Sequence, residues 1–169
     1  MKILSGILLN MEIGTLLVDA SKGSLTLCKW LPESGKPFVI KKREDYGEED
    51  FNIIERTESW LKGYFSGNFK PFEMPYELIG TPFDKKVWNE ISTLQYGETI
   101  SYGDLARRIG NPVAVRAVAG ACGRNPIAII VPCHRVVGSH GKLGGYTGGI
   151  ERKLHMLKLE SVAEGLFKV

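Results

Sequence analysis

Short runs that are apolar, or that alternate between apolar and polar residues, mark the first third of the chain. Three runs follow this pattern, over residues 2–9, 14–20 and 24–31. Turn-forming residues at 10–14 and 21–23 separate them, as antiparallel hairpins require. The pattern therefore predicts a small antiparallel sheet.

From residue 49 the apolar spacing changes to that of a helix. Apolar and aromatic side chains then recur at three- and four-residue intervals, and Gly67 ends the run. The spacing predicts a helix over 49–67 that covers one face of the sheet. Its aromatic residues are expected in the core rather than in a ligand site.

Residues 68–82 contain three prolines and no sustained periodicity, which predicts a linker and a domain boundary near Gly80. Helical spacing resumes at Phe83 and ends at Gly97. Two shorter helical patterns follow, at 101–109 and 113–122.

A Gly-Asn-Pro turn separates these two patterns, with Asn111 expected to cap the second helix and Pro112 to begin it. Two short helices joined in this way are typical of a helix-turn-helix. The predicted fold class is α/β in the α+β sense. Residues 1–80, with the linker 68–80, form a sheet-and-helix scaffold, and residues 81–169 form a mainly helical domain with a winged-helix-like helix-turn-helix.

Charge is distributed unevenly between the two predicted domains. Residues 1–80 carry 10 Lys and Arg against 12 Asp and Glu, whereas residues 81–169 carry 12 against 7. A basic domain suggests a polyanionic partner, although a solvated surface of mixed charge remains an alternative.

Composition narrows the class of protein further. The chain is 43% hydrophobic and 24% charged, which is typical of a globular protein. No apolar run reaches the ~18 residues that span a bilayer, and no secretory signal is evident, so we expect a cytoplasmic location without membrane association. Three cysteines without CxxC or zinc-type spacing predict free thiols, no metal and no cofactor.

The second helix of the predicted helix-turn-helix has unusually small side chains. Between Val113 and Gly123 its residues are Ala, Val, Gly and Cys apart from Arg116. Such a helix cannot read many base edges in a major groove. It could approach a minor groove closely and offer one arginine to the base stack, or it could be a packed core helix with a surface arginine.

Residues 125–137 contain the strongest candidates for a catalytic role. In this segment an apolar run is followed by Pro132, Cys133, His134 and Arg135. A thiolate is the reactive form of cysteine, and positive neighbours favour it. The pattern therefore indicates a nucleophilic Cys133, although adjacent Cys and His side chains need not touch.

The second half of the chain resembles the O6-alkylguanine-DNA alkyltransferases, also called methylated-DNA-protein-cysteine methyltransferases. The resemblance covers nearly all of residues 83–160. It is carried by six motifs in the family's order: Ser101-Tyr102-Gly103, Asn111-Pro112, Arg116-Ala-Val, Asn125-Pro126, Val131-Pro-Cys-His-Arg-Val136 and Gly144-Gly-Tyr-Thr-Gly-Gly149.

The resemblance implies a DNA repair protein that flips O6-alkylguanine out of duplex DNA and transfers the alkyl group irreversibly to its own Cys133. His134 would act as base through a bound water, oriented by Glu160. Tyr102 would contact the flipped base and supply a proton as guanine leaves. Asn125 would tie the turn before Cys133 to the helix-turn-helix.

The resemblance also implies DNA-binding and base-binding residues. Arg116 would fill the vacated place in the duplex. Further DNA contacts are expected at Tyr102, Asn111, Ala114, Val115 and Ser139. The pocket for the base would be lined by Trp88, Val136, Tyr146 and Thr147, and Thr147 stands where some members use Ser to contact O6.

Two other functions stay open at this point. The chain could be a sensor that binds alkylated bases and recruits repair factors without chemistry, although the related non-catalytic proteins replace the cysteine. It could also be a Cys-His hydrolase. The zinc ligands of some family members are absent. A monomer is expected, and activity on O4-alkylthymine is left open.

Overall fold

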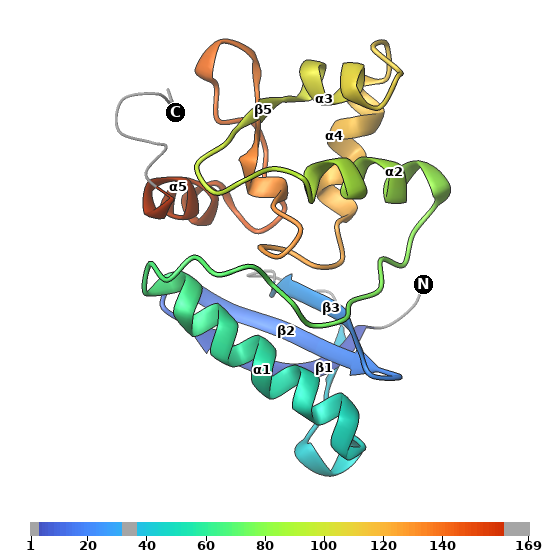
Figure 1. The fold of residues 1–169 in the computed structure, drawn as a ribbon, viewed down its shortest axis with the longest axis vertical. Helices are drawn as coiled ribbons and strands as arrows, with labels where there is room; N and C mark the ends of the chain where they lie inside the picture. The colour runs from blue at the N-terminus through green and yellow to red at the C-terminus, as the bar shows by residue number, and fades with distance from the viewer. Residues whose placement is uncertain (1–3, 32–36, 161–169) are drawn as a thin grey trace. The chain divides into compact units, whose positions relative to one another are not determined.

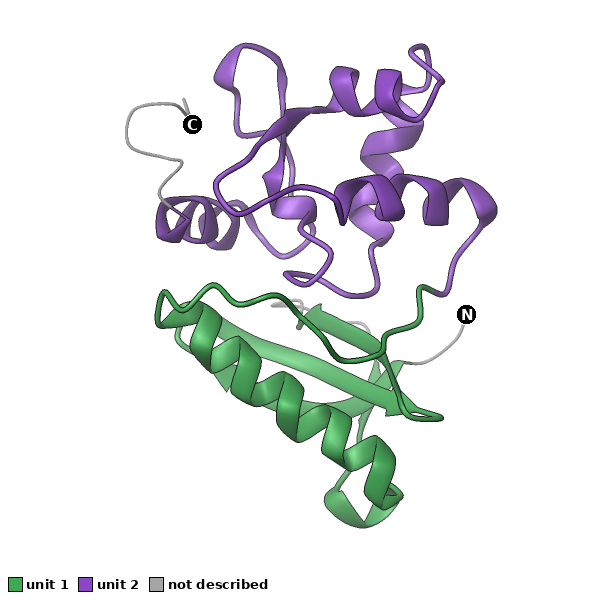
Figure 2. Cartoon of the chain, in the orientation of Figure 1, with its two compact units in different colours: residues 1–78 green, residues 79–169 purple. Residues whose placement is uncertain are grey.

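A computed structural model of the chain describes residues 4–31 and 37–160. It divides the chain into two units, residues 1–78 and 79–169, shown in different colours in Figure 2. The division falls two residues before the glycine at which the sequence suggests a boundary. None of the helices in the described segments is long and apolar enough to cross a membrane.

The first unit is built on a four-stranded sheet whose first three strands form two hairpins, as the alternating pattern predicts. These strands are β1 (Leu4–Met11), β2 (Gly14–Ser21) and β3 (Ser24–Trp30), paired antiparallel in sequence order. β2 is central, and three consecutive side chains in it, Leu16, Leu17 and Val18, are fully buried. The sheet core therefore lies along β2.

The expectation of a purely antiparallel sheet is wrong at one edge. A fourth strand, β4 (Phe38–Ile40), pairs in parallel with β1, which gives a mixed sheet in the order β3-β2-β1-β4. Three residues are too short a run for alternation to be recognised in sequence. The strand also exposes Val39 and Ile40, so it lacks an apolar face that points to the core.

The helix expected after the sheet is α1 (Glu48–Phe65), which follows a short 3₁₀ turn, η1 (Arg43–Asp45). It lies across one face of the sheet (Figure 1), as predicted. Its buried side chains are Ile53, Ile54, Thr57, Leu61 and Tyr64. The Gly23 amide, in the β2–β3 turn, donates to Asp50 in the first turn of α1 at 2.7 Å, so the turn and the helix end are joined directly.

The second unit is mainly helical, with one short pair of parallel strands (Figure 1). Its elements in chain order are α2 (Pro82–Ile91), β5 (Ile100–Ser101), α3 (Tyr102–Arg108), α4 (Val115–Arg124), η2 (Cys133–Arg135), β6 (Val136–Val137), η3 (Ser139–Gly141) and α5 (Ile150–Leu159). Because β5 pairs with β6, the entry to α3 lies beside the strand that follows η2. The fold is α+β, as predicted.

The helix pair α3–α4 occupies the place of the expected helix-turn-helix, but the second helix begins later than predicted. Its N-cap is Ala114, and Pro112 and Val113 belong to a turn. The Ala114 amide donates to the Asn111 carbonyl at 3.0 Å, and the Asn111 amide donates to the Ala106 carbonyl at 2.9 Å. Asn111 is therefore used to end α3 rather than to cap α4, and Val113 is left 91% exposed at the tip of the turn.

α2 is fastened to α4 by a buried tryptophan. Trp88 is 1% exposed, and its indole N–H donates to the Ala121 carbonyl at 2.8 Å. Ala121 lies in the last turn of α4, where carbonyls lack partners within the helix. The Asp84–Arg124 ion pair joins the same two helices.

Replacing Trp88 by Phe should lower the free energy of unfolding by about 1–3 kcal/mol, because a buried carbonyl loses its donor. Trp60→Phe is the matched control, since the Trp60 indole also donates to a carbonyl, that of Lys70, but on a partly exposed face. Urea denaturation of both variants measures the difference. Equal losses of unfolding free energy in the two variants would show that the buried hydrogen bond from Trp88 to α4 stabilises the protein no more than the partly exposed one from Trp60.

Candidate active site

Cys133 is the first residue of a 3₁₀ turn, η2, and the side chain of Asn125 hydrogen-bonds to it and to the segment before it. The Asn125 amide nitrogen donates to the Val131 carbonyl at 2.8 Å and to the Cys133 sulfur at 3.1 Å, while its oxygen accepts from the Ile127 amide at 3.0 Å. All four residues are buried. One side chain therefore orders the approach to the thiol and supplies a hydrogen bond that favours a thiolate.

The segment between them contains a strained residue. Ile129 has φ 73°, a left-handed conformation that a β-branched side chain rarely adopts and that costs about 1–3 kcal/mol. Its side chain is buried, and flanking backbone hydrogen bonds from Ile130 to Ala128 and from Val131 to Ile127 close the turn. The backbone before Cys133 is thus set by packing and hydrogen bonds together.

The next two residues of η2 converge on one buried carboxylate, that of Glu160. His134 Nε2 lies 2.9 Å from Glu160 Oε1. The Arg135 guanidinium donates through Nε to Oε2 at 2.8 Å and through Nη2 to Oε1 at 2.9 Å, and its Nη1 donates to the Leu94 carbonyl at 2.7 Å. Glu160 therefore connects η2, the end of α5 and the segment after α2.

The electrostatics of this network fix the protonation of its members. Burial acts to raise the pKa of the Glu160 carboxyl, but hydrogen bonds from His134 and Arg135 outweigh it and hold that pKa well below its usual range. Burial lowers the pKa of His134, with Glu160 opposing this shift. His134 is therefore neutral near pH 7. Because a carboxylate can only accept, the proton is assigned to Nε2, which leaves a lone pair on Nδ1.

A lysine lies in the same interior. Lys153 of α5 is 0% exposed, and its ammonium donates to the Val136 carbonyl at 2.6 Å and to the Gly145 carbonyl at 3.2 Å. Burial lowers its pKa to about 8, and the thiolate forms of Cys133 and Cys122 act in the opposite direction. Lys153 and a Cys133 thiolate therefore stabilise each other's charged form.

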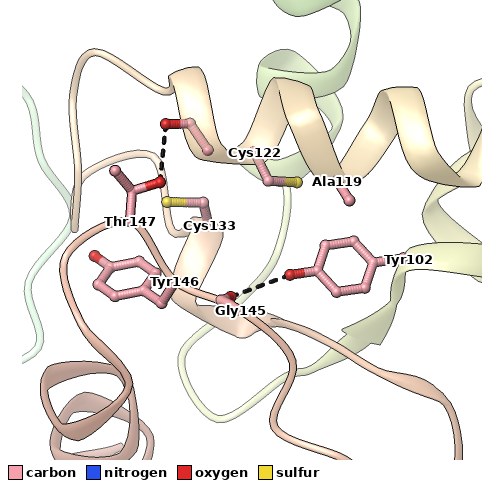
Figure 3. Close-up of a pocket in the computed structure, with 8 residues that line it drawn as sticks. Tyr102, Ala119, Cys122, Cys133, Gly145, Tyr146 and Thr147 are labelled. Atoms are coloured by element: carbon pink, nitrogen blue, oxygen red, sulfur yellow. Dashed lines mark hydrogen bonds between the residues drawn. The ribbon is translucent and has the colours of Figure 1, made fainter.

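The thiol opens into a pocket of 370 Å³, called here the thiol pocket (Figure 3). Its walls come from α3, α4, η2 and the loop before α5. The lining residues are Tyr102, Ala119, Cys122, Gly123, Cys133, Gly145, Tyr146 and Thr147. The pocket therefore places one nucleophile among aromatic, small and backbone groups, which suits a flat ring carrying a small reactive substituent.

Comparisons with known proteins agree with this chemistry. The family described as "6-O-methylguanine DNA methyltransferase, DNA binding domain" matches residues 82–162. A methylated-DNA-protein-cysteine methyltransferase of Mycobacterium bovis is 55% identical over 152 residues, which cover 90% of this chain and 89% of that protein. The chain belongs to this methyltransferase family.

Solved structures show the same architecture. Mycobacterium tuberculosis OGT, crystallised in complex with DNA, is 41% identical with a TM-score of 0.79, and the alignment covers 96% of each chain. An O6-methylguanine DNA methyltransferase from Methanococcus jannaschii is 26% identical with a TM-score of 0.65, covering 96% of this chain and 97% of that one. Both units of the chain therefore follow the fold of this methyltransferase family.

The structure brings together most of the side chains that the sequence suggests for chemistry in such a methyltransferase. Cys133, Tyr102, Tyr146 and Thr147 line one pocket, and Asn125 contacts the thiol directly. His134 and Glu160 lie in the buried network adjoining Cys133.

Apart from Tyr102, the residues suggested for DNA contact lie away from this interior. Asn111, Val115, Arg116 and Ser139 are exposed, and Ala114 is half-buried. Four of these five flank or begin α4. Ser139 belongs instead to η3, in the loop that follows β6.

Two residues expected in the base pocket are not placed there. Trp88 is committed to the α2–α4 contact, where its N–H is already bonded to Ala121. The Val136 side chain is fully buried in β6, and only its carbonyl takes part in the site, as acceptor for Lys153. The aromatic wall of the pocket comes from Tyr102 and Tyr146 instead.

Sequence reasoning missed Lys153 and the anchoring role of Arg135. A signal for Lys153 was present: Lys153, Met156, Leu157 and Glu160 are spaced i, i+3, i+4, i+7, the buried stripe of an amphipathic helix. Charged residues at both ends of such a stripe indicate buried, partnered ionic groups. No comparable local signal links Arg135 to a carboxylate 25 residues away.

Glu160→Gln should lower the free energy of unfolding by about 3–5 kcal/mol, because it leaves the buried Arg135 guanidinium without its counter-charge. Glu98→Gln is the matched control, since Glu98 forms an exposed pair with Arg108 that contributes about 0–1 kcal/mol. Denaturant titration at pH 7 compares them. A loss from Glu160→Gln no larger than the control's would contradict the anchoring role.

Stability should also fall at acid pH in two steps. The unfolded chain takes up a proton at His134 below pH 6.5, whereas the buried imidazole does not. It takes up a second at Glu160 below pH 4.5, whereas the folded carboxylate stays ionised. Unfolding free energies measured from pH 8 to pH 3 should decline below 6.5 and more steeply below 4.5, and Glu160→Gln should lack the second decline. A flat profile across this range would overturn both assignments.

Proposed function

We propose that the protein repairs O6-alkylguanine in duplex DNA by transferring the alkyl group to Cys133 in a single turnover. The observation that carries this proposal is the Cys133 sulfur, which lines the thiol pocket, accepts a hydrogen bond from Asn125 and adjoins the buried His134–Glu160 network. Single turnover follows because the product is a stable thioether, from which the cysteine thiolate is not readily displaced. A cytoplasmic location and a monomeric state belong to the same proposal.

The DNA-binding step uses the exposed start of α4. Small side chains there allow close approach to a minor groove, and Arg116 is the exposed cation in the second position of the helix. Phosphate contacts from the basic second unit would position the duplex without reading sequence. Arg116 then occupies the gap left when the damaged guanine turns into the thiol pocket.

The chemical step is a displacement at the alkyl carbon. His134, with its lone pair on Nδ1, takes the thiol proton through a bound water. The Asn125 donor and the Lys153 charge stabilise the resulting thiolate. A sulfur–carbon bond forms as the carbon–O6 bond breaks, and the bonding electron pair passes to the guanine ring.

Tyr102 is suited to complete the charge balance. Burial raises its pKa to about 12, with the two neighbouring thiolates adding to the shift, so the phenol keeps its proton near neutral pH. Its hydroxyl donates to the Gly145 carbonyl at 3.2 Å and lines the pocket. When guanine is bound, the same hydroxyl can donate its proton to a ring nitrogen as the carbon–O6 bond breaks. The proton that His134 took from the thiol then restores the phenol, so the net transfer is of one proton from the thiol to the guanine.

Cys133→Ala should abolish alkyl transfer while retaining affinity for DNA, because the nucleophile is lost but the α4 surface is not. Intact-protein mass spectrometry after incubation with a duplex containing one O6-methylguanine should show one added methyl group on the wild type and none on the variant. Cys28→Ala, which removes a buried thiol in the sheet of the first unit, is the control and should still gain the methyl group. Tight binding without any mass gain on the wild type would favour the sensor function instead.

Arg116→Ala should slow repair in duplex DNA by at least tenfold and leave transfer from free O6-benzylguanine within about twofold. The physical reason is that Arg116 acts on the duplex and not on the thiol, and holding a base out of the stack is worth a few kcal/mol. Single-turnover rates on both substrates measure the split, and Lys62→Ala on α1 serves as an exposed-lysine control. Equal slowing on the two substrates would remove Arg116 from the flipping step.

A further inference from the structure

The two sides of the thiol pocket are joined by one hydrogen bond at the end where the thiol lies. The Thr147 hydroxyl, in the loop before α5, donates to the Gly123 carbonyl at 3.0 Å, in the last turn of α4. Figure 3 shows this bond beside the Cys133 sulfur, with Tyr102 and Ala119 at the opposite end of the pocket. All of these residues line the same pocket.

Gly123 is suited to this contact because it has no side chain. A Cβ added at Gly123 would lie 3.1 Å from Thr147 Oγ1, closer than ordinary van der Waals contact. Its neighbour in α4, Arg124, is meanwhile anchored to Asp84 of α2, which holds this end of the helix in place. Thr147 therefore meets a fixed carbonyl at short range.

The Thr147 hydroxyl hydrogen is used in the bond to the Gly123 carbonyl. A threonine hydroxyl has one hydrogen to donate, so while the bond to Gly123 exists Thr147 cannot donate to a substrate oxygen. Its contribution in this arrangement is to hold the loop against α4. The separation of these two walls is thus set by a polar contact in addition to packing.

The geometry of the reaction determines which part of a substrate lies between Thr147 and Gly123. An alkyl carbon that is attacked by Cys133 must lie next to the sulfur, so the substituent on O6, and not the guanine ring, occupies the end bounded by Thr147 and Gly123. We propose that the Thr147–Gly123 hydrogen bond sets the width of this end of the pocket and makes Thr147 a specificity-determining residue for the size of the O6 substituent. This inference rests on the proposed alkyl transfer to Cys133.

Three variants separate the hydrogen bond from the bulk of the side chain. Thr147→Val keeps the shape and removes the donor, whereas Thr147→Ser keeps the donor and removes a methyl group. Gly123→Ala pushes the hydroxyl away from the carbonyl while leaving Thr147 intact. Thr147 is exposed and Gly123 has ordinary helical backbone angles, so each variant should fold, which thermal denaturation would verify.

The measurement is the single-turnover transfer rate from two duplexes, one with O6-methylguanine and one with O6-benzylguanine, followed by intact-protein mass. In Thr147→Val the ratio of methyl to benzyl rates should fall roughly three- to tenfold, the factor that one ordinary hydrogen bond is worth. Gly123→Ala should shift the ratio in the same direction. Thr147→Ser should stay within twofold of the wild-type ratio.

The double variant Thr147→Val, Gly123→Ala should shift the ratio by less than the sum of the two single shifts, because both changes break one bond. Additive shifts would overturn the proposal. An unchanged ratio in Thr147→Val, or a shift in Thr147→Ser as large as in Thr147→Val, would also overturn it, since volume and not the hydrogen bond would then matter. Absence of methyl transfer by the wild type would instead refute the underlying alkyl transfer.

Discussion

The Glu160 carboxylate, at the end of α5, is the buried charge on which the reactive part of the molecule depends. It receives the guanidinium of Arg135 through two nitrogens and the imidazole of His134 through one, while Arg135 also reaches the Leu94 carbonyl. A carboxylate in an apolar interior is stable only when its oxygens are satisfied in this way. The contacts that stabilise Glu160 therefore also hold η2, and with it Cys133, in one position. The same hydrogen bonds contribute to the stability of the second unit and to the position of Cys133, so a substitution that breaks one of them should affect both stability and reactivity.

α5 also contributes the second charge that bears on the thiol. Lys153 and Glu160 lie seven residues apart on one buried stripe of α5. Because Glu160 is already paired with Arg135, it does not serve as the counter-charge of the Lys153 ammonium. A Cys133 thiolate supplies that counter-charge, and Lys153 in turn makes ionisation of the thiol easier. His134 stays neutral because burial opposes its protonation, which preserves the lone pair that a base needs. The neutral imidazole is therefore available to accept a proton, and the Lys153 ammonium lies where it would stabilise a thiolate once that form is made.

Local patterns in the sequence predict much of this arrangement and miss the parts that depend on distant contacts. The hairpins β1–β3 and helix α1 follow from the sequence, because apolar runs separated by turn residues predict the strands and apolar spacing of three and four residues predicts the helix. β4 cannot be recognised in the sequence, since it has three residues and exposes two of them. α4 begins later than the sequence predicts because Pro112, a good first helical residue, here belongs to the turn. The resemblance implies that Trp88 lines the pocket, yet its N–H donates to a carbonyl in the last turn of α4. The reactive thiol could be found because Pro132 to Arg135 is a dense local motif, whereas the partner of Arg135 lies on another helix.

The helix pair that would face DNA also forms the walls of the pocket. Tyr102 at the start of α3 donates to the Gly145 carbonyl, and Gly123 at the end of α4 accepts from Thr147, so each helix holds the loop before α5 by one hydrogen bond. These two bonds are not equivalent when a base enters. In the proposed reaction the Tyr102 hydroxyl turns from Gly145 to the ring, but Gly145 keeps a donor because Lys153 also contacts its carbonyl. The Tyr102 hydroxyl could thus leave Gly145 without leaving that carbonyl unsatisfied, whereas the Gly123 carbonyl accepts its side-chain hydrogen bond from Thr147.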